Sequence, residues 1–515
     1  MLKSSGAMAI ATLTSRLLGM VREMVYARFM GDGWVAGAFQ LAFMIPNLFR
    51  RLLGEGALTA AFIPIFKEKE KTHGEAEMWR TANAVISGLV VAASAIIGLA
   101  MIGISIALAV HSFEPQTDLM LHLLRIMFPY MLLVCLAAGF MGMLNARGHF
   151  FIPAMGATML NVVMIASVLW LAPRMGRELH EQIFALAIGV LAAGVAQAAF
   201  QLPTLWGDGF RYRWEPPWRN ETVGRVVRQM IPGTIGVAAF QINVLLTQSI
   251  AFWVSPQIVA SFNYAVRLME LPQGMFGISL ATYLLPTLSG LAAEKKYSEF
   301  RVTLRQGVST LLFFNLIAAI LLVVLAEPIV RLLFERGLFT ADSTRRATLA
   351  LVCLAPGLVA FSTVNILARA FYALGDTKTP MQISLVSLAL NLVLAAALVV
   401  PLRQGGLGIA NTTTSICNVW LLLHALRRKM GKLEMESLRK SSLLLLWAGL
   451  LAGLAAWLGW KYWESSLGHE TLALKIGAVF VPAGIAGLIY WLMALAFKIP
   501  AAKETTDLIL ARFRR

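Results

Sequence analysis

Charged side chains interrupt several strongly apolar segments of this sequence, and most of them are arginines. The arginines are Arg16, Arg22, Arg50, Arg51, Arg267 and Arg369, and the carboxylates are Glu23, Glu55 and Glu270. An ionisable group inside a membrane segment is costly, so it usually faces a water-filled cavity or a charged partner. Arg51 and Glu55 are four residues apart and Arg267 and Glu270 are three apart, so each pair can share a helix face. A surplus of positive charge remains after this pairing.

An arginine surplus of this kind favours a cavity that receives an anion. Guanidinium suits phosphate because its planar fork donates two hydrogen bonds at once and stays protonated. The alternative is that the arginines extend along their helices to reach the membrane interfaces. That alternative fits residues near helix ends better than Arg50, Arg51 and Arg267, which lie well inside their segments.

The first apolar segment shows how such residues are arranged on a helix. Ser15, Arg22 and Tyr26 follow one another at seven and four residues, so they share one face. Arg16 and Glu23 share a neighbouring face, where we expect the carboxylate to temper the charge of Arg16. We therefore expect an amphipathic helix that lines a polar space.

The elements that carry these residues are expected to be transmembrane helices. The chain has 515 residues, of which 58% are hydrophobic and only 14% are charged, whereas soluble domains carry about 25% charged residues. Lipid offers the backbone no hydrogen-bond partners, so helices are the expected spanning structure. The formal net charge of +17 is typical of a membrane protein with basic cytoplasmic loops, and we expect no nucleic-acid partner.

The fold class is predicted to be all-α, with 14 transmembrane helices in two pseudo-symmetric six-helix lobes plus two extra C-terminal helices. The expected spans are 7–29, 33–66, 81–111, 119–146, 150–172, 182–206, 226–253, 257–290, 302–334, 346–373, 379–401, 405–427, 441–462 and 472–497. The second and eighth spans contain glycine and proline and are expected to be bent or broken.

A faint internal repeat supports the two lobes. The stretch "LNARGHFFIPA" (144–154) resembles "FYALGDTKTPM" (371–381), and "GALTAAFIPIF" (56–66) resembles "GISLATYLLPTL" (277–288). Two pairs of similar segments separated by nearly the same number of residues are typical of transporters built from internal repeats. The predicted regions are an N-terminal lobe at 1–206, a cytoplasmic linker at 207–225, a C-terminal lobe at 226–427, and two further helices with an amphipathic tail at 428–515.

Orientation follows from the loops. Lysine and arginine are more frequent in the loops after even-numbered helices, which predicts a multi-pass membrane protein with both termini in the cytoplasm. The linker "GDGFRYRWEPPWRN" (207–220) mixes arginine with aromatic residues. Such a mixture can bind single-stranded nucleic acid, but between two membrane helices an interfacial aromatic belt is favoured. The tail at 507–515 is expected to lie on the inner leaflet.

No signature of an enzyme is present in the sequence. It lacks the GxxxxGK[ST] phosphate-binding loop, so ATP hydrolysis is not expected. "HEQIF" (180–184) begins like a zinc-protease motif but lacks the second histidine. We therefore expect a transporter with no catalytic residues, no metal site and no cofactor.

The sequence resembles the MurJ (MviN) lipid II flippases of the multidrug/oligosaccharidyl-lipid/polysaccharide exporter superfamily. The segments that carry the resemblance are "SRLLGMVREMVYARF" (15–29), "IPNLFRRLLGEGALTAAFIPIF" (45–66), "RLMELPQGMFGISLATYLLPTLS" (267–289) and "FYALGDTKTP" (371–380). The resemblance implies export of the undecaprenyl-diphosphate-linked peptidoglycan precursor across the bacterial inner membrane, by alternating access between two lobes.

The resemblance also implies roles for individual residues. It places the cavity arginines at Arg16, Arg22, Arg50 and Arg267, with Ser15 and Arg51 beside them and Glu55 and Glu270 as supporting carboxylates. The last two helices would form the groove for the lipid tail. Membrane lipids and other cell-wall synthesis proteins are the further partners to expect.

Two departures from the family bear on mechanism. Some members carry an aspartate in the second helix where this chain has Gly37. Some bind sodium through aspartates in the C-terminal lobe, whereas here 234–253 holds no carboxylate and the eleventh span offers only Asn391. Coupling to the membrane potential or to a monovalent cation is therefore left open.

Three alternative functions remain open. A flippase for another undecaprenyl-linked oligosaccharide would need the same arginines, because its substrate carries the same diphosphate. A drug or cation antiporter of the superfamily would need acceptor carboxylates in the cavity, in place of a positive surplus. A non-transporting scaffold of the cell-wall machinery would tolerate loss of the arginines.

Overall fold

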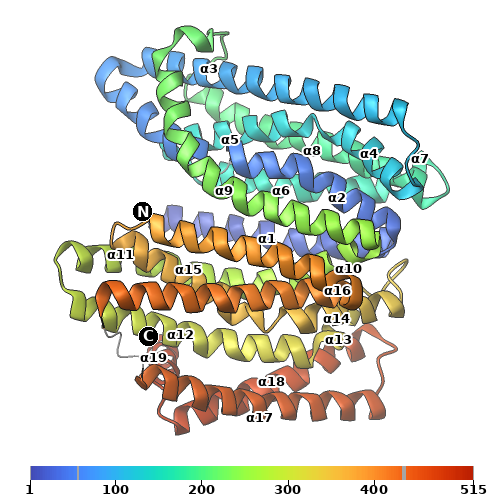
Figure 1. The fold of residues 1–515 in the computed structure, drawn as a ribbon, viewed down its shortest axis with the longest axis vertical. Coiled ribbons are helices and arrows are strands. Elements are labelled where there is room, and N and C mark those ends of the chain that lie inside the picture. The colour runs from blue at the N-terminus through green and yellow to red at the C-terminus, as the bar shows by residue number, and fades with distance from the viewer. Residues whose placement is uncertain (1, 55–56, 432–435, 514–515) are drawn as a thin grey trace. The chain divides into compact units, whose positions relative to one another are not determined.

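The computed structural model describes residues 2–54, 57–431 and 436–513, and helices dominate these ranges (Figure 1). The chain divides by its internal packing into unit 1, Met1–Ala260, and unit 2, Ser261–Arg515. Glu55 lies outside the described residues.

Unit 1 holds nine α-helices and three short π- or 3₁₀-helical segments within its described residues. They are α1 (Leu2–Met30), α2 (Trp34–Phe49), η1 (Arg50–Gly54), α3 (Ala57–Val110), α4 (Pro115–Met127), α5 (Tyr130–Ala146), α6 (Phe151–Ala166), η2 (Ser167–Leu171), α7 (Ala172–Met175), α8 (Leu179–Gly207), η3 (Pro217–Arg219) and α9 (Glu221–Val254). In unit 1, α1 packs on α6, and α9 packs on α2 and α3.

The helices of unit 2 follow from α10, which begins at the end of unit 1. They are α10 (Pro256–Pro272), η4 (Gln273–Ile278), α11 (Ser279–Ala293), α12 (Tyr297–Val324), α13 (Ala326–Phe334), α14 (Ala341–Leu354), α15 (Gly357–Ala373), α16 (Lys378–Met430), α17 (Glu436–Ser466), α18 (Leu472–Ala496) and α19 (Pro500–Phe513). The extra helices α17 and α18 pack on each other, and α17 packs on α12.

Several expected helices contain a break in the structure. The π-helical segments η1 and η4 interrupt the second and eighth expected spans, which confirms that these two are irregular. Gly74 breaks α3 with a φ of 83°, a left-handed conformation that suits glycine. Arg403 breaks α16 with a φ of 49°, between the expected spans 379–401 and 405–427.

The helix lengths and composition match the predicted all-α polytopic class. Nine of the described helices are long and apolar enough to cross a membrane, or up to 11 if two bent pairs each count as one span. These pairs are α4 with α5, bent by 42°, and α14 with α15, bent by 45°. The count of 14 spans and the lobe boundaries stay predictions.

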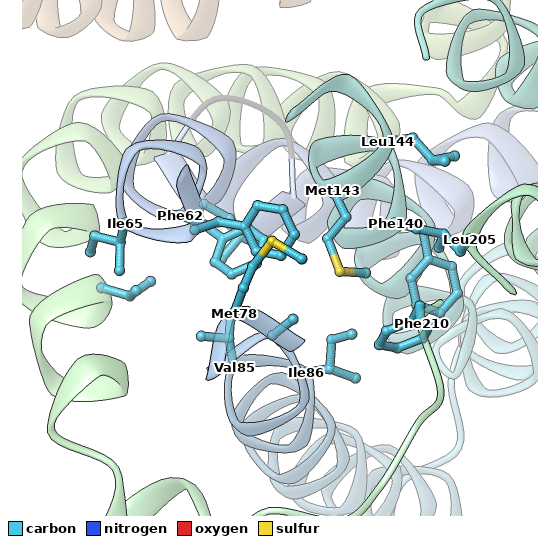
Figure 2. Close-up of a cluster of buried hydrophobic side chains, with 14 of the residues drawn as sticks. Phe62, Ile65, Met78, Val85, Ile86, Phe140, Met143, Leu144, Leu205 and Phe210 are labelled. Carbon is cyan, nitrogen blue, oxygen red and sulfur yellow. The ribbon is translucent and has the colours of Figure 1, made fainter. Parts of the chain in front are cut away.

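The core of unit 1 joins the two pieces of α3 to neighbouring helices and to the linker (Figure 2). Phe62 lies before the break at Gly74 and Met78 after it, and both are buried in the same cluster. Phe140 of α5 and Phe210 of the linker pack into it as well. Burying these apolar side chains fixes the linker against α3 and α5.

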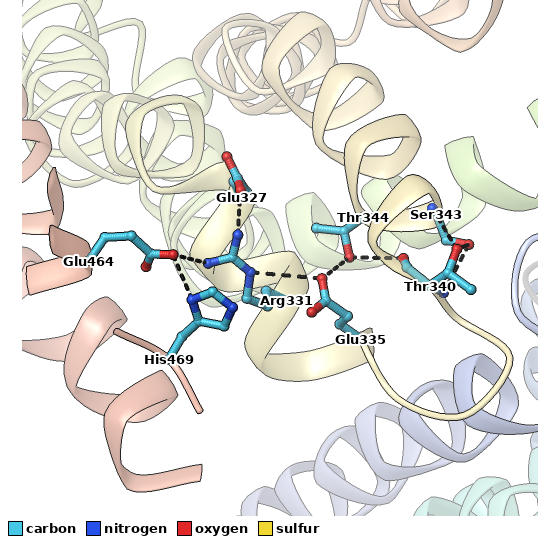
Figure 3. A network of polar contacts seen from close by, with 8 residues as sticks. All are labelled: Glu327, Arg331, Glu335, Thr340, Ser343, Thr344, Glu464 and His469. Atoms are coloured by element: carbon cyan, nitrogen blue, oxygen red, sulfur yellow. Dashed lines mark hydrogen bonds and ion pairs between the residues drawn. The ribbon is translucent and has the colours of Figure 1, made fainter. Parts of the chain in front are cut away.

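In unit 2, the end of α17 is tied to α13 by a polar network centred on Arg331 (Figure 3). The Arg331 side chain is 13% exposed and forms ion pairs with Glu327 at 2.5 Å and with Glu464 of α17 at 2.9 Å. His469, in the loop before α18, contacts Glu464 with its Nδ1 at 2.6 Å. A largely buried guanidinium needs such partners, because an unpaired charge there would be strongly destabilising.

The C-terminal helix α19 covers the predicted amphipathic tail. Its Thr506 Oγ1 accepts a hydrogen bond of 3.0 Å from Trp491 Nε1 of α18. Ile499 and Ala502 at its start are buried against unit 2. The start of α19 is therefore docked on the helical bundle, while the contact of 507–515 with a membrane stays a prediction.

The turn between α15 and α16, in the segment "FYALGDTKTP", is organised by Asp376. Its Oδ1 accepts from the Thr379 backbone N–H at 3.0 Å, and its Oδ2 accepts from Lys429 Nζ at 2.6 Å. The hydrogen bond from Lys429, followed by that from the Thr379 backbone, lowers the pKa of the Asp376 carboxyl from 3.8 to about 2. The ionised carboxylate thus caps α16 and joins its two ends.

We expect Asp376→Asn to lower the free energy of unfolding by about 1 kcal/mol at pH 7, since the charge-assisted bond to Lys429 is lost. A lowered pKa contributes stability above pH 3.8, and this contribution disappears as the pH falls through about 2. Thermal unfolding of both proteins in detergent from pH 7 to pH 2 measures this difference. A gap that persists unchanged at pH 2 would contradict the assignment.

Candidate functional site

The shared face of Ser15, Arg22 and Tyr26 on α1 is confirmed, and it rests against α6. Arg22 Nη1 donates a hydrogen bond to Asn161 Oδ1 at 3.0 Å, and Asn161 Nδ2 donates to the Ser15 carbonyl oxygen at 3.1 Å. The Arg22 guanidinium also lies 5.4 Å from the centroid of the Tyr26 ring, within reach of a cation–π interaction. Asn161 thus links two predicted site residues through one side chain.

The expectation that Glu23 tempers Arg16 is wrong. Glu23 pairs with Arg22, whose Nη2 lies 2.5 Å from Glu23 Oε1, and both side chains are nearly buried. Arg16 is exposed. A carboxylate at this depth is stabilised by the guanidinium that Asn161 holds beside it. Arg22 is therefore fixed within unit 1, whereas Arg16 is accessible.

Arg50 and Arg51 both lie in η1, at the break between α2 and α3. Arg50 Nε donates to Asn47 Oδ1 at 2.8 Å, one turn earlier on α2. Arg51 Nη1 donates to Gln241 Oε1 of α9 at 3.4 Å. Both arginines are half-buried, and each is oriented by the side-chain oxygen of a neutral amide.

The predicted pair on α10 is confirmed in unit 2. Arg267 Nη1 lies 2.8 Å from Glu270 Oε2, and the two side chains are 43% and 46% exposed. Both side chains can therefore contact water or a ligand. Next to them, η4 begins at Gln273.

The amides that position the arginines were not predicted from the sequence. Asn47, Asn161 and Gln241 are the partners described above, and each lies in a helical stretch rich in apolar residues. An amide in such a segment usually has a hydrogen-bond partner, so each could have been singled out. Its particular partner could not, because Asn161 and Arg22 are 139 residues apart.

Gly37 of α2 occupies a position where a side chain would collide with backbone. A Cβ at this position would lie 2.1 Å from the Pro256 carbonyl oxygen and 2.6 Å from its carbonyl carbon. Both residues belong to unit 1. The close approach of α2 to the start of α10 explains why a glycine stands at this position.

These helices define a multi-pass membrane protein whose fold is similar to that of solved transporters. An inward-facing multidrug resistance MATE transporter of the MOP superfamily matches with a TM-score of 0.69 at 14% identity, covering 83% of this chain and 99% of that chain. A lipid II flippase MurJ in an inward closed conformation matches with a TM-score of 0.79 at 22% identity, covering 98% and 99%.

The family model described as lipid II flippase MurJ matches residues 26–476, and the chain belongs to this family. The probable lipid II flippase MurJ of Haemophilus influenzae is 35% identical over 441 residues, 81% of this chain and 84% of that protein. The probable lipid II flippase MurJ of Vibrio cholerae is 31% identical, covering 98% of each chain.

Proposed function

We propose that this chain is a lipid II flippase, a transporter and not an enzyme. It moves the undecaprenyl-diphosphate-linked peptidoglycan precursor from the inner to the outer leaflet of the bacterial cytoplasmic membrane by alternating access. The observation that carries the proposal is the family match over residues 26–476. The arginine surplus supports it, because a diphosphate is the anion that such side chains bind well.

The proposed roles of the arginines differ with their burial. Arg16 and Arg267 are exposed, so they can contact the diphosphate directly. Arg22 is nearly buried and held by Glu23 and Asn161, so its proposed role is to fix α1 against α6. Arg50 and Arg51 of η1 and Ser15 of α1 are proposed to contribute to diphosphate binding as well.

Glu270 is proposed to orient Arg267 rather than to bind substrate. Its Oε2 accepts from Arg267 Nη1 at 2.8 Å, which holds the five-donor guanidinium fork in one orientation. A carboxylate in contact with the diphosphate would repel it. Glu270 is therefore proposed to contact Arg267 and not the substrate.

The function is tested by complementation of a bacterial strain depleted of its own flippase. We expect growth to be restored, with lipid II becoming accessible to a probe at the outer face of the membrane. Failure to restore accessibility, in cells where the protein is present in the membrane, would overturn the proposal. Restored export of a different undecaprenyl-linked glycan without lipid II would favour the alternative substrate.

The source of energy is proposed to be the membrane potential. A cavity with a net positive charge would move in the field when empty, and each charge that crosses is worth ~2.3 kcal/mol per 100 mV. We expect transport in vesicles to respond to a clamped potential without a sodium gradient. Transport that is independent of the membrane potential and requires a monovalent cation would contradict this mechanism.

Both termini are proposed to lie in the cytoplasm, as the distribution of lysine and arginine in the loops indicates. The two helices α17 and α18 would then offer a groove for the lipid tail. Labelling of a cysteine placed near each terminus with a membrane-impermeant reagent, in intact and opened cells, tests this orientation.

A further inference from the structure

The connection between α8 and α9 presents an exposed aromatic surface. Four aromatic side chains here are about half exposed or more: Trp206 at the end of α8, and Tyr212, Trp214 and Trp218 in the connection itself. Trp218 is 71% exposed, and its ring packs edge-on against Trp214 with centroids 6.4 Å apart. Exposed aromatic side chains gathered on one connection between helices, next to basic residues, point to a partner.

This connection is held in place by α3. Phe210 is buried in the core of unit 1 (Figure 2). Asn83 Nδ2 donates to the Arg211 carbonyl oxygen at 3.0 Å, and Ser87 Oγ lies 3.2 Å from Tyr212 Oη. The Glu215 backbone N–H donates to the same Ser87 Oγ at 3.4 Å. Asn83 and Ser87, buried polar residues of α3, therefore fix the backbone of this connection. The fixed backbone keeps the aromatic rings on the surface.

The exposed rings are interleaved with uncompensated positive charge. Arg213, Arg219 and Arg228 are exposed and form no ion pair within the described part of the chain. The nearby acidic residue Glu215 is engaged by Arg80 at 3.5 Å. Glu221 is a nearby exposed carboxylate. The three exposed guanidinium groups therefore give this surface a net positive charge.

The surface continues into apolar side chains on α9. Val227 and Ile231 flank Arg228 in sequence and are 50% and 51% exposed. Farther along the same helix, 237–254 is apolar enough to cross a membrane. Exposed aromatic and basic residues followed by an apolar helix typically lie at the level of the lipid headgroups.

We propose that this linker strip, formed by Tyr212, Arg213, Trp214, Trp218, Arg219 and Arg228, is a docking surface for the headgroups of anionic phospholipids. The guanidinium groups would bind the phosphodiester, and the aromatic rings would lie at the headgroup level. Charge complementarity selects the anionic lipid over a zwitterionic one. The proposal concerns a surface outside the substrate site and does not rest on the proposed function.

The test uses the full chain in detergent, titrated separately with phosphatidylglycerol and phosphatidylcholine, with bound lipid counted by native mass spectrometry. The variant carries Arg213→Gln, Arg219→Gln and Arg228→Gln. The control carries Arg174→Gln, Arg177→Gln and Arg403→Gln, which are also exposed and remove the same charge. We expect the variant to bind phosphatidylglycerol at least ~10-fold more weakly, because each arginine contributes about fivefold near an anionic surface.

Phosphatidylcholine binding and the control protein should be unchanged. Equal phosphatidylglycerol binding by variant and wild type, or equal affinity of the wild type for both lipids, would overturn the proposal. Single-stranded RNA that binds through the same three arginines more tightly than lipid would also overturn it. Thermal unfolding verifies folding, and if the triple variant unfolds, the single variants should each lose about fivefold.

Discussion

Arg267→Ala is expected to abolish lipid II transport while the protein still accumulates in the membrane. A guanidinium bound to phosphate provides charge-assisted hydrogen bonds. Each such bond contributes about 1.5–3 kcal/mol to the binding free energy, so its loss weakens substrate binding by roughly 10- to 100-fold. The side chain is 43% exposed and its pair with Glu270 is open to solvent, so its loss should change the free energy of unfolding by less than ~1 kcal/mol. Complementation of a flippase-depleted strain, with protein level measured in membranes, reports both quantities.

Two variants sharpen this result. Arg267→Lys keeps the charge but loses the fork of donors, so we expect partial transport. Leu17→Ala removes a side chain of α1 that is 60% exposed and apolar, and transport should persist. Normal growth of a strain that depends on Arg267→Ala would contradict a role in substrate binding and would favour a scaffold function.

The structure also ranks the arginines as tests of function. Arg16→Ala is a clean test because this side chain is exposed. Arg22→Ala would leave the nearly buried Glu23 without its ion pair and Asn161 without its donor, so it combines a loss of function with a loss of stability. A defect of Arg22→Ala therefore needs a measurement of unfolding beside it.

Gly37→Ala is expected to destabilise the protein by about 3 kcal/mol, the upper range for inserting a methyl group into a packed interior. The new Cβ would lie 2.1 Å from the carbonyl oxygen of Pro256, and backbone cannot rotate away as a side chain can. Aspartate at this position should be worse, because it adds a charge at the same contact. Thermal unfolding in detergent measures the loss.

Gly98→Ala is the matched control, since a Cβ at Gly98 in α3 meets no atom within 4 Å. Alanine favours a helix over glycine by ~1 kcal/mol, so this change should be neutral or stabilising. If Gly37→Ala unfolds at the wild-type temperature, α2 does not approach Pro256 in the resting protein as described. The glycine would then need another explanation.

Local features of the sequence predicted the helical class and part of the site. Apolar runs and scarce charge indicate membrane helices, because lipid leaves the backbone no other partners. The three-residue spacing of Arg267 and Glu270 predicted their ion pair, since one helical turn brings such residues together. Glycine and proline in the second and eighth spans likewise predicted the irregular segments that η1 and η4 now occupy.

Contacts between distant segments were decided only by the tertiary structure. Glu23 was expected to pair with Arg16 through helical spacing, yet it pairs with Arg22, which Asn161 holds from 139 residues away. Likewise, Gln241 reaches Arg51 across 190 residues, and Pro256 excludes a side chain at Gly37. Helical period relates residues within about two turns of one helix, so the sequence alone determined the helices and their local pairs. Which amide fixes each arginine depends on how whole helices pack, and a single sequence carries no periodic signal for that.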